Sequence, residues 1–141
     1  MLSYKTLEQA RTDKAQLENM HQALNAAKTA FRRDDCDLWV ISGKHGYIST
    51  WGDGESFHIV CIAESSERQW GADKKRLSFC RLTQNGDFDG AFRLDRLPTP
   101  DEAASIRKAL GIGKAPNFHD EFRERLRARM SAVREDDLVM A

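Results

Sequence analysis

Arg81 and Arg93 are the first candidates for chemistry in this sequence, because the strands expected around them bring two like charges together. If residues 77–83 and 91–95 pair as a hairpin centred near Asp87, Arg81 lies opposite Arg93. Like charges in that position destabilise a sheet, so an anionic group is expected over the pair. It is a phosphate backbone, an acidic partner surface or a set of the protein's own carboxylates. The candidate carboxylates are Asp34, Asp35, Asp73 and Asp95.

More basic side chains surround this pair in the expected fold, and Trp70 lies beside them. Trp70 either stacks on a nucleic-acid base or belongs to the core. The sequence therefore predicts one binding site for a phosphate or a partner, made of Lys74, Lys75, Arg76, Arg81, Arg93, Arg96 and Trp70.

Motifs for catalysis and metal binding are absent from the sequence. It contains no Gly-x-Ser-x-Gly elbow, no His-Glu-x-x-His pair, no dinucleotide fingerprint and no P-loop. His58 and Cys61 have a zinc-ligand spacing, but alternation along a strand puts them on opposite faces. The loop 85–90 copies the first half of an EF-hand, yet Arg96 stands where the bidentate glutamate belongs. We therefore expect no catalytic residues, no metal and no cofactor.

The charge balance limits the classes of partner. The chain has 141 residues with 22 basic and 22 acidic side chains, so its formal net charge is zero. This excludes a uniformly basic or acidic protein but allows local patches of either sign. No apolar run approaches the roughly 20 residues of a membrane span, and the start of the chain lacks a secretion pattern. The 3 widely spaced cysteines fit a reducing compartment, so we expect a cytoplasmic protein that does not associate with membranes.

Residues 4–32 are expected to form one long N-terminal helix. The segment contains neither glycine nor proline. Apolar side chains recur in it at three- and four-residue steps, at Leu17, Met20, Leu24, Ala27 and Phe31. Such a helix either lies across a sheet or forms the seam of a homodimer.

Period-two patterns after this helix predict a five-stranded antiparallel sheet. A meander of three strands is expected at 38–42, 47–51 and 57–62, and a hairpin at 77–83 and 91–95. On the core side of the hairpin, Cys80 is expected opposite Leu94 and Leu82 opposite Phe92. A short helix at about 65–76 connects the two units. The predicted fold class is α+β, with the long N-terminal helix, this sheet and two C-terminal helices.

The two C-terminal helices are separated by a linker. Thr99-Pro100-Asp101-Glu102 matches a capping box, so the first helix spans 99–110 and ends at Gly111. Residues 1–112 are expected to form a single domain, residues 113–117 the linker, and residues 118–141 an amphipathic helix with a short tail.

The last helix, expected at 118–135, has an apolar stripe flanked by arginines. It folds back onto its own domain, docks on a partner or pairs with a second copy. Its predicted partner face consists of Phe118, Phe122, Arg123, Leu126 and Arg127.

The middle of the chain, about residues 38–112, resembles a family of small uncharacterised bacterial proteins. The resemblance is carried by RLSFCRLTQNGD at 76–87, LDRLPTPDEA at 94–103 and IRKALGI at 106–112. Members of this family are common on plasmids, phages and other mobile elements. The resemblance implies a protein that binds host macromolecules, such as an anti-CRISPR inhibitor, and it assigns no role to any residue.

The sequence thus favours a non-enzymatic binding protein that acts as an inhibitor or adaptor of a host or phage protein or nucleoprotein complex. The alternative is a nucleic-acid-binding module that uses the basic residues of the second hairpin.

Overall fold

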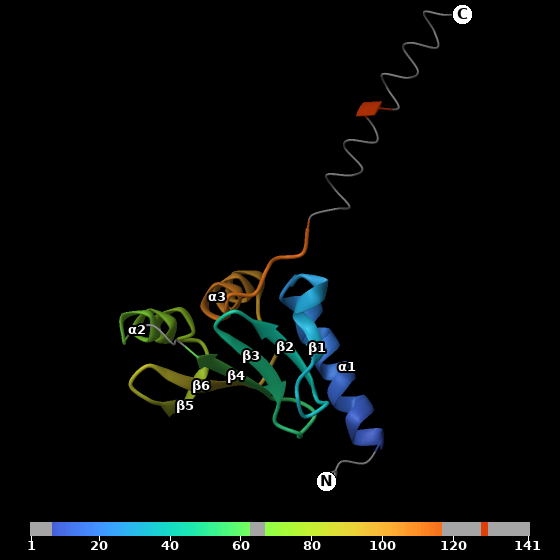
Figure 1. Cartoon of the computed structure of the whole chain (residues 1–141), viewed down its shortest axis with the longest axis horizontal. Coiled ribbons are helices and arrows are strands. Elements are labelled where there is room, and N and C mark those ends of the chain that lie inside the picture. The colour runs from blue at the N-terminus through green and yellow to red at the C-terminus, as the bar shows by residue number, and fades with distance from the viewer. Residues whose placement is uncertain (1–6, 63–66, 117–127, 130–141) are drawn as a thin grey trace, which may run out of the picture.

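The computed structural model describes residues 7–62, 67–116 and 128–129 (Figure 1). Within these residues the fold is α+β, as predicted, with three α-helices against a six-stranded antiparallel sheet. The helices are α1 (Leu7–Ala23), α2 (Glu67–Arg76) and α3 (Pro100–Leu110). None of the described helices is both long and apolar enough to cross a membrane.

The strands of the sheet follow the order β1-β2-β3-β4-β6-β5. They are β1 (Phe31–Arg33), β2 (Trp39–Gly43), β3 (Gly46–Thr50), β4 (Phe57–Ile62), β5 (Arg81–Asn85) and β6 (Asp89–Leu94). The predicted meander corresponds to β2, β3 and β4, and the predicted hairpin to β5 and β6. Pairing of β6 with β4 joins these two units into one sheet.

The N-terminal helix is shorter than predicted, and the sheet has one more strand. We expected a helix over 4–32, but α1 ends at Ala23, Asn25 adopts a left-handed conformation with a φ of 49°, and residues 31–33 form β1. Phe31 satisfies the helical spacing, yet it belongs to a strand that pairs with β2. The helical spacing was misleading here, because Phe31 fits the apolar stripe of the preceding helix and also the strand that pairs with β2 across a short loop. Residues 4–6 lie outside the described residues.

The first strand of the second hairpin begins later than predicted. The N–H of Leu77 donates to the Asp73 carbonyl at 2.9 Å, and the N–H of Cys80 donates to the Leu77 carbonyl at 2.9 Å. These bonds hold both residues in turns after α2, so the predicted pairing of Cys80 with Leu94 was wrong.

The rest of the predicted hairpin register is confirmed, since Arg81 faces Arg93 and Leu82 faces Phe92. Leu82 is nonetheless 42% exposed, because β5 is the last strand of the sheet and lies beyond the core.

Helix α3 begins and ends as the sequence predicted. The Thr99 side chain accepts a bond from the Glu102 N–H, and the Glu102 carboxylate accepts one from the Thr99 N–H, which completes the capping box. Gly111 closes the helix in a left-handed conformation with a φ of 66°.

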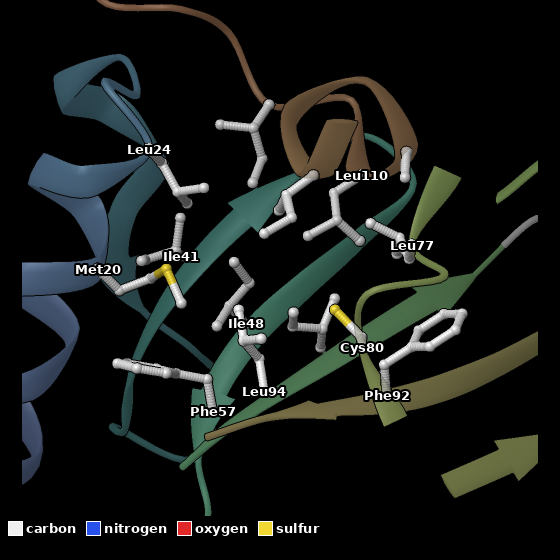
Figure 2. Close-up of a cluster of buried hydrophobic side chains, with 14 of the residues drawn as sticks. Met20, Leu24, Ile41, Ile48, Phe57, Leu77, Cys80, Phe92, Leu94 and Leu110 are labelled. Atoms are coloured by element: carbon white, nitrogen blue, oxygen red, sulfur yellow. The ribbon is translucent and has the colours of Figure 1, made fainter. Parts of the chain in front are cut away.

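The core lies between the sheet and the three helices (Figure 2). Ile41, Ile48, Ile59 and Phe92 form one continuous row across β2, β3, β4 and β6, and each is 2% exposed or less. The helices cover this row with Leu17, Met20, Leu24, Ile106 and Leu110, and the segment around α2 adds Trp70 and Leu77. The apolar stripe of α1 is therefore used within the chain's own core, as in the alternative in which the helix lies across a sheet.

The chain leaves the domain at the β1 edge of the sheet. Lys114 forms an isolated bridge with Ala26, and the N–H of Ala115 donates to the Asn25 carbonyl at 2.8 Å. Of the predicted helix 118–135, only residues 128–129 are described, so its apolar stripe and the linker's last residue lie outside the described residues.

Gly90 gives a test of the packing between α2 and the hairpin. A Cβ at this position would lie 2.2 Å from the Gln84 carbonyl oxygen and 2.3 Å from Cζ2 of Trp70. We expect Gly90→Ala to lower the free energy of unfolding by about 1–3 kcal/mol, because the backbone cannot move aside. Urea denaturation monitored by circular dichroism measures this change.

Gly71→Ala is the matched control, because Gly71 lies inside α2 with open space around it. This variant should be more stable by about 0.5–1 kcal/mol, since alanine is the better helix former. Equal effects of the two substitutions would contradict the proposed packing of Trp70 on Gly90.

Candidate binding surface

The face of the sheet opposite the helices, called the outer face below, carries the side chains that alternate with the core residues. They form two rows, with Val40, Ser49, His58 and Arg93 in one and Ser42, Tyr47, Val60 and Ala91 in the other. Val40 and Ala91 are buried by their neighbours but do not belong to the core cluster. Helices α1, α2 and α3 all contribute to the core on the other side, and the first half of α1 also borders a groove beside this face.

Trp51 is the exposed aromatic side chain at the end of the outer face. It is 43% exposed, meets the His58 ring edge-on with the ring centroids 4.7 Å apart, and has the Arg93 guanidinium 5.4 Å from its ring centroid. Burial lowers the pKa of His58, whose Nδ1 atom is buried and has no hydrogen-bond partner among the described residues. The imidazole is therefore neutral at pH 7 and acts as an aromatic support for Trp51.

Arg93 is fixed by a network that neutralises it. Its Nε donates to Asp95 at 2.7 Å, and its Nη2 donates to Asp53 at 3.0 Å and to the Ser56 hydroxyl at 2.8 Å. The Ser56 hydroxyl in turn donates to Asp95 at 2.7 Å. The backbone carbonyl of Ser56 accepts a bond from the side chain of Gln16 in α1. The loop that carries Trp51 is thereby tied both to β6 and to the helix layer.

This network neutralises Arg93 with the protein's own carboxylates, whereas Arg81 opposite it has no carboxylate partner among the described residues. Asp95 was among the predicted carboxylates, whereas Asp53 was missed. No local sequence pattern marks this contact, because Asp53 lies in the β3–β4 loop and reaches Arg93 only once β4 and β6 pair. Asp34 instead accepts bonds from two N–H groups of its own loop, and Asp73 pairs with Arg76.

The other predicted basic residues do not form one cluster. Arg76 pairs with Asp73 at 3.0 Å, and Arg96 pairs with Glu102 at 2.6 Å. Lys74 donates to the Asn85 side chain and lies over the Trp70 ring, 5.4 Å from its centroid. Among the described residues, no carboxylate pairs with Lys74, Lys75 or Arg81.

Trp70 is a core residue. It is 1% exposed, and its indole N–H donates to the Asn85 side chain at 3.0 Å and to the Gly86 carbonyl at 3.1 Å. It therefore has no free ring face for a base, which corrects the stacking alternative. These two bonds hold the start of the loop 85–90 against Trp70, so this loop has a structural role in the fold.

An excess of carboxylates lies at the end of the sheet that carries Trp51. Three segments meet there, namely 33–38, 51–56 and 93–95. Against Arg33 and Arg93 they contain Asp34, Asp35, Asp37, Asp53, Glu55 and Asp95. We call this region the acidic end. Hydrogen bonding to the N–H groups of Glu55 and Ser56 lowers the pKa of Asp53 to about 2, so this carboxylate is ionised at neutral pH.

Grooves connect the β1 edge to the outer face. One, of about 500 Å³, is lined by the first half of α1, the β1–β2 loop and, from the outer face, Val40, Tyr47 and Ser49. Another, of about 320 Å³, begins at Gly113 and includes Arg32 and Ser42.

No group of three potential metal ligands is found among the described residues. Cys61 and Cys80 are buried, and burial raises the pKa of each thiol to about 12. They are packing residues, whereas Cys36 is exposed. The predicted partner-face residues Phe118, Phe122, Arg123, Leu126 and Arg127 lie outside the described residues.

Comparisons with known proteins give no relative for this chain: no family model, no curated protein and no solved structure matches it.

The Arg93 network predicts a specific pH dependence. Because the pKa of Asp53 is lowered from 3.8 to about 2, its stabilising effect is present above pH 3.8 and is lost as the pH falls toward about 2. Asp53→Asn should therefore flatten the loss of stability over this interval. Thermal denaturation at a series of pH values measures the effect, and Glu55→Gln, in the same loop, should leave the slope unchanged. An unaltered slope for Asp53→Asn would contradict the network.

Proposed function

We propose that the chain is a non-enzymatic binding protein whose outer face docks a segment of a partner protein. The observation that supports this most directly is Trp51, exposed yet held by His58, Arg93 and the Ser56 network. A positioned aromatic side chain loses little conformational entropy on binding, which is typical of interface hot spots.

The chemistry of the surface defines the partner segment. At the centre of the outer face Tyr47 and Val60 are half-buried beside Ser42 and Ser49, whereas Val40 and Ala91 are buried, so the segment is expected to present an apolar side chain to Tyr47 and Val60. The acidic end favours arginine or lysine at one end of that segment. We therefore propose a basic amphipathic segment as the occupant, with Trp51 packed against its apolar or cationic side chains.

The family resemblance suggests the biological context of this proposal. An inhibitor or adaptor encoded on a mobile element would use such a surface to occupy a host or phage protein or nucleoprotein complex. The proposal assigns no catalytic role to any residue. Each residue on which it rests would bind or orient a partner.

Trp51→Ala tests the role of the outer face. Loss of a hot-spot tryptophan costs about 2 kcal/mol or more, so the affinity for the partner should fall by about 30-fold. Tagged full-length chain is used to capture the partner in cells, and the affinity is then measured with the purified partner by calorimetry.

Phe88→Ala is the matched control, because Phe88 is a similarly exposed aromatic residue, at 51%, in the turn between β5 and β6. It should leave the affinity unchanged. If both variants bind like the wild type, or if the chain recovers only nucleic acid, the proposal is wrong.

Nucleic-acid binding is the second candidate, and it is favoured by one observation. Lys74, Lys75 and Arg81 have no carboxylate partner among the described residues, so phosphates could neutralise them. If a labelled single-stranded oligonucleotide binds, its affinity should fall steeply with salt, with a log–log slope of about −0.7 per phosphate contact. Lys75→Glu with Arg81→Glu should abolish binding, while Lys108→Glu on α3 should not. Salt-independent binding would exclude this candidate.

A further inference from the structure

We propose that strand β5 is a second docking site, at which an extended acidic segment of a partner protein adds to the sheet as a further strand. The inference goes beyond the proposed function, because it concerns the free edge of the sheet and not its outer face. β5 is the last strand of the sheet (Figure 1), and all 5 of its residues are exposed. Its neighbour β6 is mostly buried.

The backbone of β5 has hydrogen-bonding groups that its own sheet does not use. Among the described residues, β5 pairs with β6 alone, and its backbone makes no other backbone hydrogen bond. In an antiparallel pair, the N–H and C=O groups of alternate residues point away from the partner strand. They are therefore available to the main chain of an added strand. The opposite edge offers fewer such groups, because β1 has only 3 residues.

The side chains of β5 define what the added strand must carry. Leu82 faces Phe92 on the core side of the sheet and is 42% exposed, so an apolar side chain beside it would extend the core across the edge. Arg81 points to the other side of the sheet, where it faces Arg93. The charge of Arg93 is met by two carboxylates, whereas no carboxylate pairs with Arg81 among the described residues. A carboxylate on the added strand would neutralise Arg81.

A second basic side chain lies at the other end of the strand. Lys74 of α2 donates to the side chain of Asn85 at 3.2 Å, and within the described part of the chain it has no carboxylate partner. An extended segment paired with β5 would therefore meet a cation near each end. Because neighbouring residues of a strand point to opposite faces, the acidic residue beside Arg81 is adjacent to the apolar residue beside Leu82. The segment that fits is acidic at both ends and apolar directly inside them.

The same features disfavour a second copy of the chain as the occupant. Antiparallel pairing of two β5 strands about Thr83 would place Arg81 of each copy at the end that holds Lys74 of the other, which brings like charges together. A bulge between Leu82 and Gln84 also distorts the strand. Bulges and charged side chains are the usual means by which sheet edges avoid self-pairing. An acidic partner converts the repulsion between these cations into attraction.

The test uses the full chain and a synthetic peptide, Ser-Glu-Val-Thr-Val-Glu-Ser, whose pattern is the same in either direction. Titration of the isotope-labelled chain, followed by NMR, should shift the amide signals of residues 81–85 most, and amide exchange of β5 should slow. The same peptide N-methylated at both valines and the threonine keeps its charges but lacks the central N–H groups. It should bind about tenfold more weakly, because the strand hydrogen bonds cannot form.

Arg81→Glu tests the charge. The residue is exposed and has no ion pair among the described residues, so the variant should keep the fold. Replacing attraction by repulsion should weaken binding of the acidic peptide about five- to tenfold. A peptide with lysine in place of both glutamates should bind this variant more tightly than the wild type. Lys108→Glu on α3 is the matched control and should bind the acidic peptide as the wild type does.

The inference is overturned if the acidic peptide does not bind, if the N-methylated peptide binds equally well, or if Arg81→Glu leaves the affinity unchanged. A dimer in light scattering whose interface protects the β5 amides would assign the edge to a second copy. A single-stranded oligonucleotide that binds at Arg81 while the peptide does not would assign it to nucleic acid. None of these results bears on the proposed function, whose test changes Trp51 on the outer face.

Discussion

The apolar row of Ile41, Ile48, Ile59 and Phe92 is the contact on which the rest of the molecule is assembled. All three described helices pack on this row, so the hydrophobic contribution of the fold comes from one side of the sheet. Because side chains alternate along each strand, burial of this row also fixes which residues point the other way. The positions of Tyr47, His58 and Arg93 on the outer face are thus a consequence of core packing.

The electrostatic cost of that arrangement falls on Arg93. It faces Arg81 across the β5–β6 pair, and the sheet tolerates this because Asp53 and Asp95 surround it. Both carboxylates come from the end of the sheet, where they add to a local excess of negative charge. The carboxylates that offset the repulsion between the two arginines therefore contribute to an acidic surface beside Trp51, although the chain as a whole is neutral.

Local signals in the sequence predicted the elements that local bonds determine. The Thr99 capping box, the Gly111 C-cap and the register of Arg81 against Arg93 are confirmed. The sequence did not reveal β1 or the contact of Asp53 with Arg93. β1 pairs with the next strand, but its Phe31 also fits the helical spacing of the segment before it, whereas the contact of Asp53 with Arg93 joins residues 40 apart in the chain.

The outer face was missed for a related reason. The period-two pattern predicts where the strands lie, but it does not show which face of the sheet the helices cover. In the structure the described helices contribute to the core on the side that carries Ile41, Ile48 and Ile59. The side chains of Tyr47, His58 and Val60 point to the opposite side of the sheet.

Ser56 joins the two layers of the molecule. Its carbonyl accepts from Gln16 in the helix layer, while its hydroxyl bonds Arg93 and Asp95 beside the outer face, and the residue is 1% exposed. Any change at this position alters stability and surface geometry at the same time. Trp51, by contrast, can be exchanged with little effect on the core. We therefore expect Ser56 to tolerate substitution less well than Trp51, since only the serine couples the helix layer to the far side of the sheet.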